Sequence, residues 1–167
     1  MRGVRLALLL VLVACSTGVK HDDAPLTMPP PTTPEPARAM PKVALATPQG
    51  EAVVSVEVVA TEAKIQRGLM YRQHLPPDEG MLFMMPGEHA PERDGWPFWM
   101  HNTLIPLDLI WIDKDMTIVE IFENAKVRDD TEIGGHKPAR YVLEVNGGYV
   151  AAHKVAVGAK VRFDGVR

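Results

Sequence analysis

The stretch that decides the fold is EAVVSVEVVA, residues 51–60. Three valines at positions 54, 56 and 58 alternate with the polar residues Ser55 and Glu57. Successive side chains of a β-strand point to opposite faces, so this alternation gives one apolar and one polar face. Valine is also enriched in strands because its branched side chain packs well on a pleated surface. The segment therefore predicts a half-buried strand.

The residues that follow, 61–70, predict a helix. Thr61 is a residue type that caps helix N-termini, and Glu62 suits the positive end of the helix dipole. Ile65 and Leu69 fall on one face at helical spacing. One clear helix thus follows the strand directly.

Working outward, the remaining pattern is mainly one of short strands. Segments 107–112 and 116–123 form a predicted hairpin across the turn Asp113-Lys114-Asp115, and 147–153 predicts a second, short helix. Further strands are predicted at 43–46, 81–85, 96–100, 141–145 and 160–163. The fold class is therefore α+β, mainly β: a compact, strongly bent or barrel-like sheet of about seven short strands with one clear helix.

The first fourteen residues have the character of a secretory signal peptide. Arg2 and Arg5 precede an uninterrupted apolar run, residues 6–13, which is too short for a membrane span of about 20 residues. The run ends in LVAC, residues 12–15, which resembles the lipobox of bacterial lipoproteins. That resemblance implies that Cys15 receives a diacylglyceryl thioether and becomes the new N-terminus. The alternative is an ordinary signal peptide with Cys15 as an incidental thiol.

Residues 15–41 predict an extended tether behind the lipid. Seven prolines, at positions 25, 29, 30, 31, 34, 36 and 41, fix φ and remove backbone donors. A spacer is the favoured interpretation, and a ligand for a proline-binding module is the alternative. The organisation is then a signal peptide (1–14), a lipidated cysteine with its tether (15–41) and one globular domain (42–167). Ser16 resembles the sorting signal for the outer membrane, which would place the domain in the periplasm.

Composition excludes several function classes. Cys15 is the only cysteine, so the domain has no internal disulfide, cysteine-ligated zinc or catalytic thiol. After Cys15 the chain carries 16 basic and 21 acidic residues, a net charge of −5, which disfavours nucleic acid as a partner. No glycine-rich phosphate loop or histidine metal spacing is present, so we predict no cofactor.

Five sequence blocks occur in an order that is similar to a known family. They are RGLMYR (67–72), GMLF (80–83), FWMHNT (98–103), IPLD (105–108) and YVLE (141–144). Together they resemble the family called domain of unknown function 192, over about residues 53–163. The resemblance implies a small α+β fold, often secreted or membrane-tethered, and carries no established activity. His101 stands where the family more often has lysine, and Ala159 where an aspartate is frequent.

The densest group of polar and aromatic residues is the candidate ligand site. Trp99 lies near the end of the predicted strand 96–100, and His101, Asn102 and Thr103 lie in the connection that follows, with Asp108 after the connection. A flat ring and a few fixed hydrogen-bonding groups are what a pocket for a sugar or another neutral polar ligand needs. The alternative is architectural: Asn102 and Thr103 stabilise a turn, Asp108 binds backbone N–H groups, and Trp99 belongs to the core.

Two charged residues sit beside apolar positions elsewhere in the blocks. Arg67 and Glu144 can approach the connection that carries the candidate site. A structural ion pair between them is the favoured interpretation. A clamp on the ligand is the alternative.

These features predict an envelope-tethered, non-enzymatic domain that binds a small polar or saccharide-like ligand or a protein partner. Its membrane contact is the lipid on Cys15. One alternative is a hydrolase that uses His101 as a base oriented by Asp108. Another is periplasmic copper binding through methionine and histidine, the candidate ligands being Met81, Met84, Met85, Met100 and His101.

Overall fold

The computed structural model describes residues 39–85 and 95–166. The predicted signal peptide, Cys15 and all but the last three residues of the predicted tether lie outside these ranges. The elements are, in chain order, β1 (Lys42–Thr47), β2 (Gly50–Val59), α1 (Glu62–Arg67), β3 (Glu79–Met84), β4 (Leu107–Ile112), β5 (Ile118–Ala125), β6 (Tyr141–Asn146), α2 (Tyr149–His153) and β7 (Val161–Asp164). No helix within the described ranges is long and apolar enough to cross a membrane.

All seven strands belong to one sheet, in the order β5-β4-β6-β3-β2-β1-β7. Every neighbouring pair is antiparallel except β2 and β3, which are parallel. Parallel neighbours need a crossover connection, and α1 lies in the crossover between these two strands. The mainly β class predicted from the sequence is confirmed.

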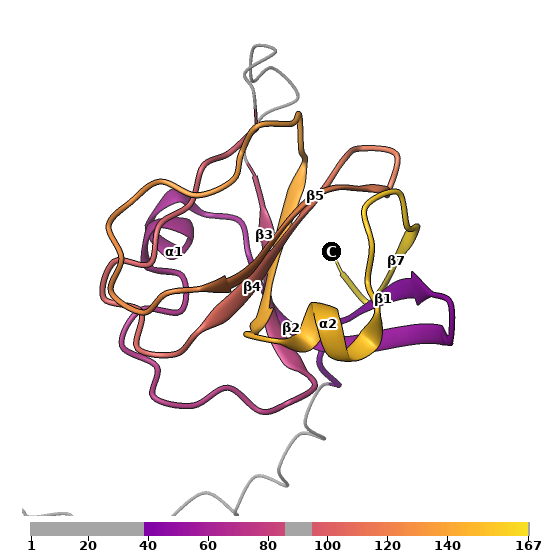
Figure 1. The fold of residues 1–167 in the computed structure, drawn as a ribbon, viewed down its shortest axis with the longest axis horizontal. Coiled ribbons are helices and arrows are strands. Elements are labelled where there is room, and N and C mark those ends of the chain that lie inside the picture. Colours follow the sequence, from indigo (N-terminus) through magenta and orange to yellow (C-terminus); the bar gives the residue numbers. More distant parts are fainter. Residues whose placement is uncertain (1–38, 86–94, 167) are drawn as a thin grey trace, which may run out of the picture. The chain divides into compact units, whose positions relative to one another are not determined.

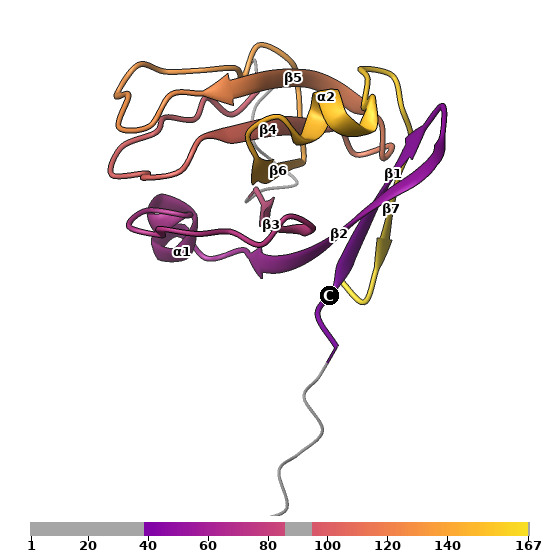
Figure 2. The ribbon, with the colours of Figure 1, turned by 60° about the horizontal axis from the view of Figure 1, so that its bottom comes forward.

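The sheet curls until its two edges meet at one end. Thr117, just before β5, bridges Lys160, just before β7. The Ile118 amide donates to the Ala159 carbonyl at 2.9 Å, and the Val161 amide donates to the Met116 carbonyl at 2.9 Å. Figure 2 shows β1 and β2 sweeping out of the plane of the remaining strands to make this closure possible. The predicted strongly bent sheet is therefore confirmed, and the pairing protects strand edges that would otherwise be open.

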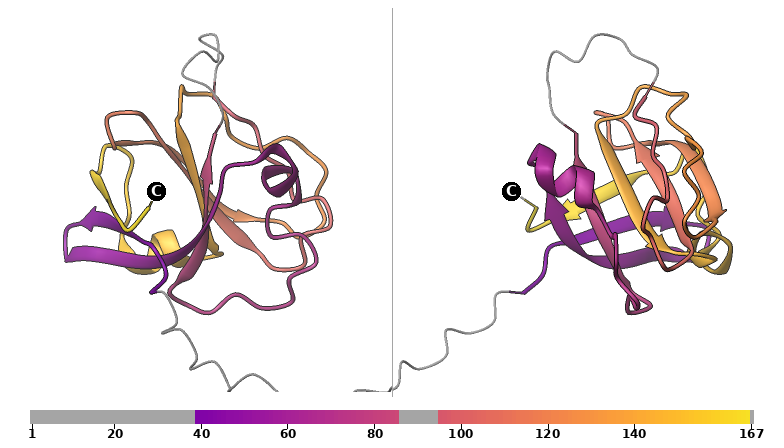
Figure 3. Two further views of the ribbon diagram at one scale, coloured as in Figure 1. Left: turned by 180° about the vertical axis from the view of Figure 1, so that it is seen from behind. Right: turned by 90° about the vertical axis from the view of Figure 1, so that its left-hand side faces the viewer.

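Each face of the sheet has its own apolar core and its own helix. The face toward α2 buries Val54, Val56, Leu82, Ile110, Ile112, Leu143, Val145 and Val150, among others. The opposite face, toward α1, buries Leu69, Met81, Phe83, Met100, Leu107, Leu109, Trp111 and Val142, among others. Figures 1 and 3 show the two helices on opposite sides of the sheet. This division decides which side chains can share a site.

One predicted strand is wrong. Residues 96–100 form no strand, and only Phe98 makes a bridge, with Ile133, through hydrogen bonds of 3.0 and 2.8 Å. Pro97 has no N–H to donate, and the apolar side chains of this segment instead pack on the α1 face of the sheet. The predicted helix 61–70 is also shorter, because α1 ends at Arg67 and Gly68 adopts a φ of 45°.

Candidate ligand-binding site

Two loop segments meet on the α1 side of the sheet. Tyr71 follows α1, and Asn102 lies in the connection before β4. The Tyr71 amide donates to the Asn102 carbonyl at 2.9 Å, and the Asn102 side-chain amide donates to the Tyr71 hydroxyl at 2.8 Å. These two bonds fix the segment 67–72 against the segment 98–103.

A cavity of about 350 Å³ opens between α1 and these loops. Ligand pockets typically have volumes of about 300–1,000 Å³, so it is large enough for a small molecule. Its described lining is Glu62, Ile65, Gln66, Arg67, Gly68, Leu69, Met70, Phe83, Met85, Trp96, Pro97, Phe98, Trp99, Thr103 and Glu144. We call it the Glu144 cavity.

Glu144 is the buried carboxyl group of this cavity. It lies on β6, paired with Met81 of β3 on one side and Leu109 of β4 on the other. The residue is only 4% exposed, and its Oε2 has no hydrogen-bond partner among the described residues. Burial raises the pKa of Glu144 to about 8, so the side chain is mostly a neutral acid at pH 7. A buried polar atom without a partner is costly to folding and marks a candidate functional group.

Two glycines of the sequence blocks shape the surroundings of Glu144. A Cβ on Gly80 would lie 2.5 Å from the Glu144 carbonyl oxygen, so β3 and β6 could not approach as they do. A Cβ on Gly68 would come within 3.3 Å of the Phe83 ring, and Gly68 also has a positive φ of 45°. Glycine at these positions keeps the strands close and leaves space beside the Phe83 ring, which lines the cavity.

Aromatic rings form the wall of the Glu144 cavity. Phe83 and Phe98 meet edge to face with their centroids 5.0 Å apart, and Phe98 contacts Trp111 in the same way at 6.0 Å. Trp99 is 47% exposed and stacks on His101 with centroids 5.2 Å apart. Trp99 therefore offers the cavity a partly free ring, and it is not a core residue.

The structure brings together four of the residues predicted for the ligand site. Arg67, Trp99, Thr103 and Glu144 line the cavity. No ion pair joins Arg67 to Glu144 among the described residues, which agrees with the neutral state of the buried acid. The hydroxyl of Thr103 makes one long hydrogen bond, 3.4 Å, to the His101 carbonyl.

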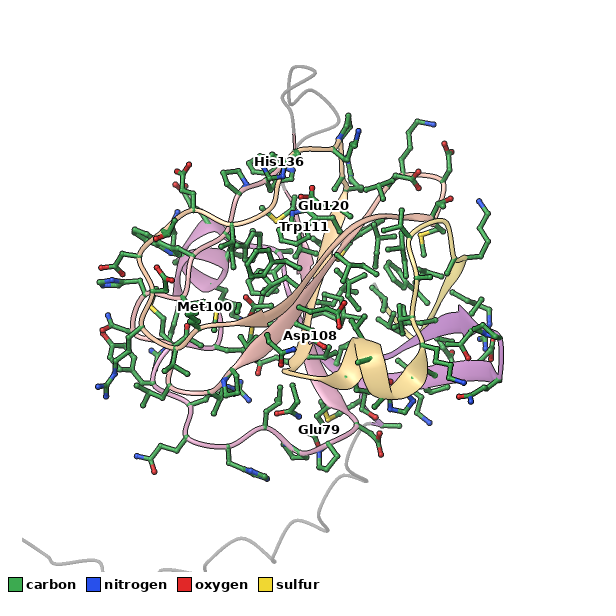
Figure 4. The ribbon with its side chains drawn as sticks, viewed as in Figure 1. Glu79, Met100, Asp108, Trp111, Glu120 and His136 are labelled. Atoms are coloured by element: carbon green, nitrogen blue, oxygen red, sulfur yellow. The ribbon has the colours of Figure 1, made fainter. Side chains whose placement is uncertain are left out.

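Asp108 lies on the other face of the sheet. Its neighbours in β4, Leu107 and Leu109, belong to the core on the α1 side. Ile110 and Val150, one of the hydrogen-bond partners of Asp108, belong to the core on the α2 side. Asp108 Oδ1 accepts hydrogen bonds from the amides of Asn124 (2.8 Å) and Gly148 (3.1 Å), and Oδ2 accepts one from Val150 (2.8 Å). Figure 4 shows it beside α2, with Met100 on the opposite side of the sheet. The carboxylate thus holds the start of α2 and does not reach the cavity.

The proposed pair of His101 and Asp108 is not formed. His101 Nδ1 lies 2.7 Å from Oδ1 of Asp130, a residue with an exposed side chain. The sheet separates this contact from the carboxylate of Asp108. His101 contacts the cavity wall by stacking on Trp99, and Asn102 bonds to Tyr71, which does not line this cavity. Neither His101 nor Asn102 lines the cavity.

Comparison with known proteins places the chain in a family. Residues 44–163 match the family DUF192, described as "Uncharacterized ACR". The chain belongs to the DUF192 family. No curated protein matches it.

Two solved structures are similar to this DUF192 protein. A protein of unknown function from Novosphingobium aromaticivorans DSM 12444 has 34% identity and a TM-score of 0.66, and the match covers 77% of this chain and 89% of that one. A protein from Sinorhizobium meliloti 1021, described as a "putative transcription regulator", has 34% identity and a TM-score of 0.67, covering 79% of this chain and 100% of that one.

The sequence blocks of the DUF192 chain converge on the cavity. RGLMYR, GMLF, FWMHNT and YVLE each contribute at least one lining residue, for example Arg67, Phe83, Trp99 and Glu144. IPLD contributes none, since its aspartate holds α2. Four of the five blocks thus contribute residues to the Glu144 cavity.

A second hollow of about 490 Å³ adjoins the cavity. Its described lining is Glu57, Val59, Lys64, Arg67, Gly68, Met70, Tyr71, Arg72 and Met81, and we call it the Arg67 hollow. Arg72 forms an ion pair with Glu57. Sequence reasoning missed Lys64 and Arg72, because exposed charges on a helix and its end are ordinary. Their spacing around Arg67 was the available signal.

The methionines proposed as copper ligands are mostly core residues. Met81, Met85 and Met100 are 2%, 6% and 1% exposed and pack in the apolar cluster on the α1 face. Within the described ranges, no three histidine, cysteine, aspartate or glutamate side chains gather as a metal site.

Proposed function

We propose that this DUF192 domain is a non-enzymatic binding module that holds a small saccharide-like ligand in the Glu144 cavity. The observation that carries the proposal is the unpartnered, neutral carboxyl of Glu144 in a cavity walled by aromatic rings. A protonated acid offers one O–H donor and one acceptor, which is what a sugar hydroxyl can satisfy. The partly exposed ring of Trp99 supplies a flat apolar surface on which the apolar face of a pyranose ring can pack.

Binding is favoured over catalysis by the chemistry of the lining. The described lining contains no histidine, cysteine or serine, and its one hydroxyl, that of Thr103, contacts a backbone carbonyl. A nucleophile next to an activating base is therefore lacking among these residues. The other carboxylate, Glu62, lies on the exposed first turn of α1.

We further propose that the domain is anchored to the outer membrane and faces the periplasm. The support is the apolar run 6–13, the lipobox-like LVAC at 12–15 and the proline-rich segment to residue 41. A multiply acylated cysteine anchors strongly, because each buried methylene adds about 0.8 kcal/mol of membrane affinity. Radiolabelled palmitate should label the wild type and not Cys15→Ser. Equal labelling of the two proteins would remove the anchor from the proposal.

The binding proposal is tested by calorimetry and thermal melting on the full-length chain carrying Cys15→Ser, against a panel of mono- and disaccharides. We expect at least one neutral sugar to raise the melting temperature. Trp99→Ala and Glu144→Leu should each weaken its binding about tenfold or more, whereas Glu144→Gln, which keeps a donor and an acceptor, should bind within a few-fold of the wild type. Glu123→Gln, which changes an exposed carboxylate outside the cavity, is the matched control.

Two results would contradict the proposal. One is that no sugar in the panel shifts the melting temperature. The other is that the Trp99→Ala and Glu144→Leu variants bind a positive sugar as tightly as the wild type does.

A further inference from the structure

The two hollows on the α1 side have part of their lining in common. Arg67, Gly68 and Met70 line both the Glu144 cavity and the Arg67 hollow. Gly68 has no side chain, so Arg67 and Met70 supply the only side chains among the shared lining residues. A ligand seated in the cavity beside Arg67 would thus have the Arg67 hollow as its neighbouring space.

The Arg67 hollow carries an excess of positive charge. Lys64, Arg67 and Arg72 line it together with one acid, Glu57. Glu57 is paired with Arg72, whereas the side chains of Lys64 and Arg67 are exposed and make no hydrogen bond or ion pair with any described residue. Two unpaired cations side by side contrast with the chain as a whole, whose net charge is −3.

These unpaired cations have one structural role that must be separated from binding. Both belong to the last turn of α1, where positive side chains favour the carbonyl end of the helix dipole. That effect amounts to about 0.3–1 kcal/mol and does not require the two residues to border a hollow. The helix dipole does not explain why Lys64 and Arg67 line the same hollow, or why Arg67 also lines the Glu144 cavity.

We infer that the ligand is an acidic sugar, with its ring in the Glu144 cavity and a carboxylate or phosphate substituent in the Arg67 hollow beside Lys64 and Arg67. This inference rests on the proposed binding function and names its ligand class. The planar guanidinium of Arg67 suits two-point hydrogen bonding to either anion, and the Lys64 ammonium adds a point charge. The neutral carboxyl of Glu144 does not repel such a ligand.

The test compares matched sugars by titration calorimetry on the full-length Cys15→Ser chain. The probes are glucose, glucuronate and glucose 6-phosphate, then N-acetylglucosamine and its 6-phosphate, with inorganic phosphate alone as a further arm. We expect at least one acidic sugar to bind about tenfold or more tightly than its neutral parent, with an advantage that shrinks as salt is raised. Comparing glucuronate with the phosphosugars distinguishes the two kinds of anion.

Charge variants locate the anion. Lys64→Gln, at a residue that lines only the Arg67 hollow, should reduce the preference for the acidic probe and leave binding of the neutral parent within a few-fold. The double variant Lys64→Gln with Arg67→Gln should abolish the preference. Glu57→Gln frees Arg72 and should strengthen binding of the acidic probe. Lys126→Gln, an exposed cation outside both hollows, is the control and should change neither. Melting curves of each variant establish that it is folded.

The outcomes separate the two proposals. Equal binding of neutral and acidic sugars, unaffected by the double variant, overturns the acidic ligand and leaves sugar binding intact. Inorganic phosphate that binds as tightly as a phosphosugar also overturns the two-part ligand. Failure of every sugar, neutral or acidic, to bind overturns both proposals.

Discussion

Asn102 and Tyr71 hold each other by both backbone and side chain, and both have a positive φ, 53° and 65° respectively. Asparagine tolerates the left-handed region because its side chain can hydrogen-bond locally, whereas tyrosine is uncommon there. The two strained positions support one another across the junction of the segments that line the Glu144 cavity. We therefore expect the backbone conformation of Tyr71 and Asn102 to contribute more to the stability of this junction than their exposed side-chain hydrogen bond does.

This ranking predicts the outcome of substitutions at Asn102. Asn102→Gly and Asn102→Ala both lose the amide bond to Tyr71, but only alanine meets the steric cost of the left-handed conformation. We expect the alanine variant to be less stable than the glycine variant by about 1 kcal/mol in urea denaturation. Tyr71→Phe, which removes only an exposed hydroxyl, should cost about 0.5 kcal/mol or less. A larger loss for glycine than for alanine would refute the strain argument.

The buried carboxyl of Glu144 should make the stability of the domain depend on pH. Burial raises its pKa from 4.5 to about 8 in the folded chain, so the folded state keeps a proton that the unfolded state releases between these values. The free energy of unfolding should therefore fall as pH rises from about 4.5 to about 8. The contribution of the neutral acid is complete below this window and lost above it.

Glu144→Gln isolates this effect from the other titrating groups. The amide has no charge to bury, so the variant should gain stability relative to the wild type as pH rises, by an amount on the order of a few kcal/mol by pH 8. Denaturant midpoints of both proteins from pH 5 to pH 8 provide the measurement. Parallel curves for the two proteins would show that Glu144 is not held as a neutral acid.

Substitution of Asp108 should lower the stability of the fold. Its two oxygens accept hydrogen bonds from three backbone N–H groups, and its side chain is 0% exposed. The substitution Asp108→Asn keeps the shape of the side chain but replaces one acceptor oxygen with an NH2 group, which would then face a backbone N–H donor. We therefore expect a loss of roughly 2–4 kcal/mol in the free energy of unfolding, measured by urea denaturation.

The control for Asp108→Asn is Asp130→Asn, which alters an exposed carboxylate and should change stability by about 0.5 kcal/mol or less. Ligand binding by whatever fraction of Asp108→Asn is folded should equal that of the wild type. If Asp108→Asn has wild-type stability but does not bind the ligand, Asp108 belongs to the ligand site and the structural interpretation is wrong.

The sequence predicts the sheet well because its strands alternate cleanly, as in residues 51–60, or are wholly apolar, as in residues 81–85. It fails at 96–100, where apolar composition reflects packing on the α1 face and Pro97 prevents a ladder. The curl of the sheet depends on contacts between residues 116–118 and 158–161, which are far apart in sequence and leave no local pattern.

The candidate site could be predicted only in part from the sequence. Alternation within β6 puts Glu144 on the face of Val142, and alternation within β4 puts Asp108 on the face of Ile110. Knowledge of the strand order is needed to see that these are opposite faces of one sheet. The neutral state of Glu144 depends on burial by distant segments, so no sequence pattern reports it. The Arg67 hollow depends on β2 and α1 lying together, which only the fold shows.

Trp99 and Trp111 offer the clearest separation between ligand binding and architecture. Trp111 is 0% exposed, packs against Phe98 and donates its indole N–H to the Trp96 carbonyl at 2.7 Å. Trp99 is 47% exposed, and its ring contact is with His101. Trp111→Ala should therefore cost about 3–5 kcal/mol of stability, and Trp99→Ala about 1 kcal/mol or less.

The loss of ligand binding should rank these two variants in the opposite order, because Trp99 lines the Glu144 cavity and Trp111 does not. Trp99→Ala should melt near the wild-type temperature while losing most of its affinity for the best sugar probe. Trp99→Phe, which keeps a smaller flat ring, should recover part of that affinity at unchanged stability. If Trp99→Ala instead unfolds the domain as Trp111→Ala does, the ring is part of the architecture, and the aromatic wall loses its role in recognition.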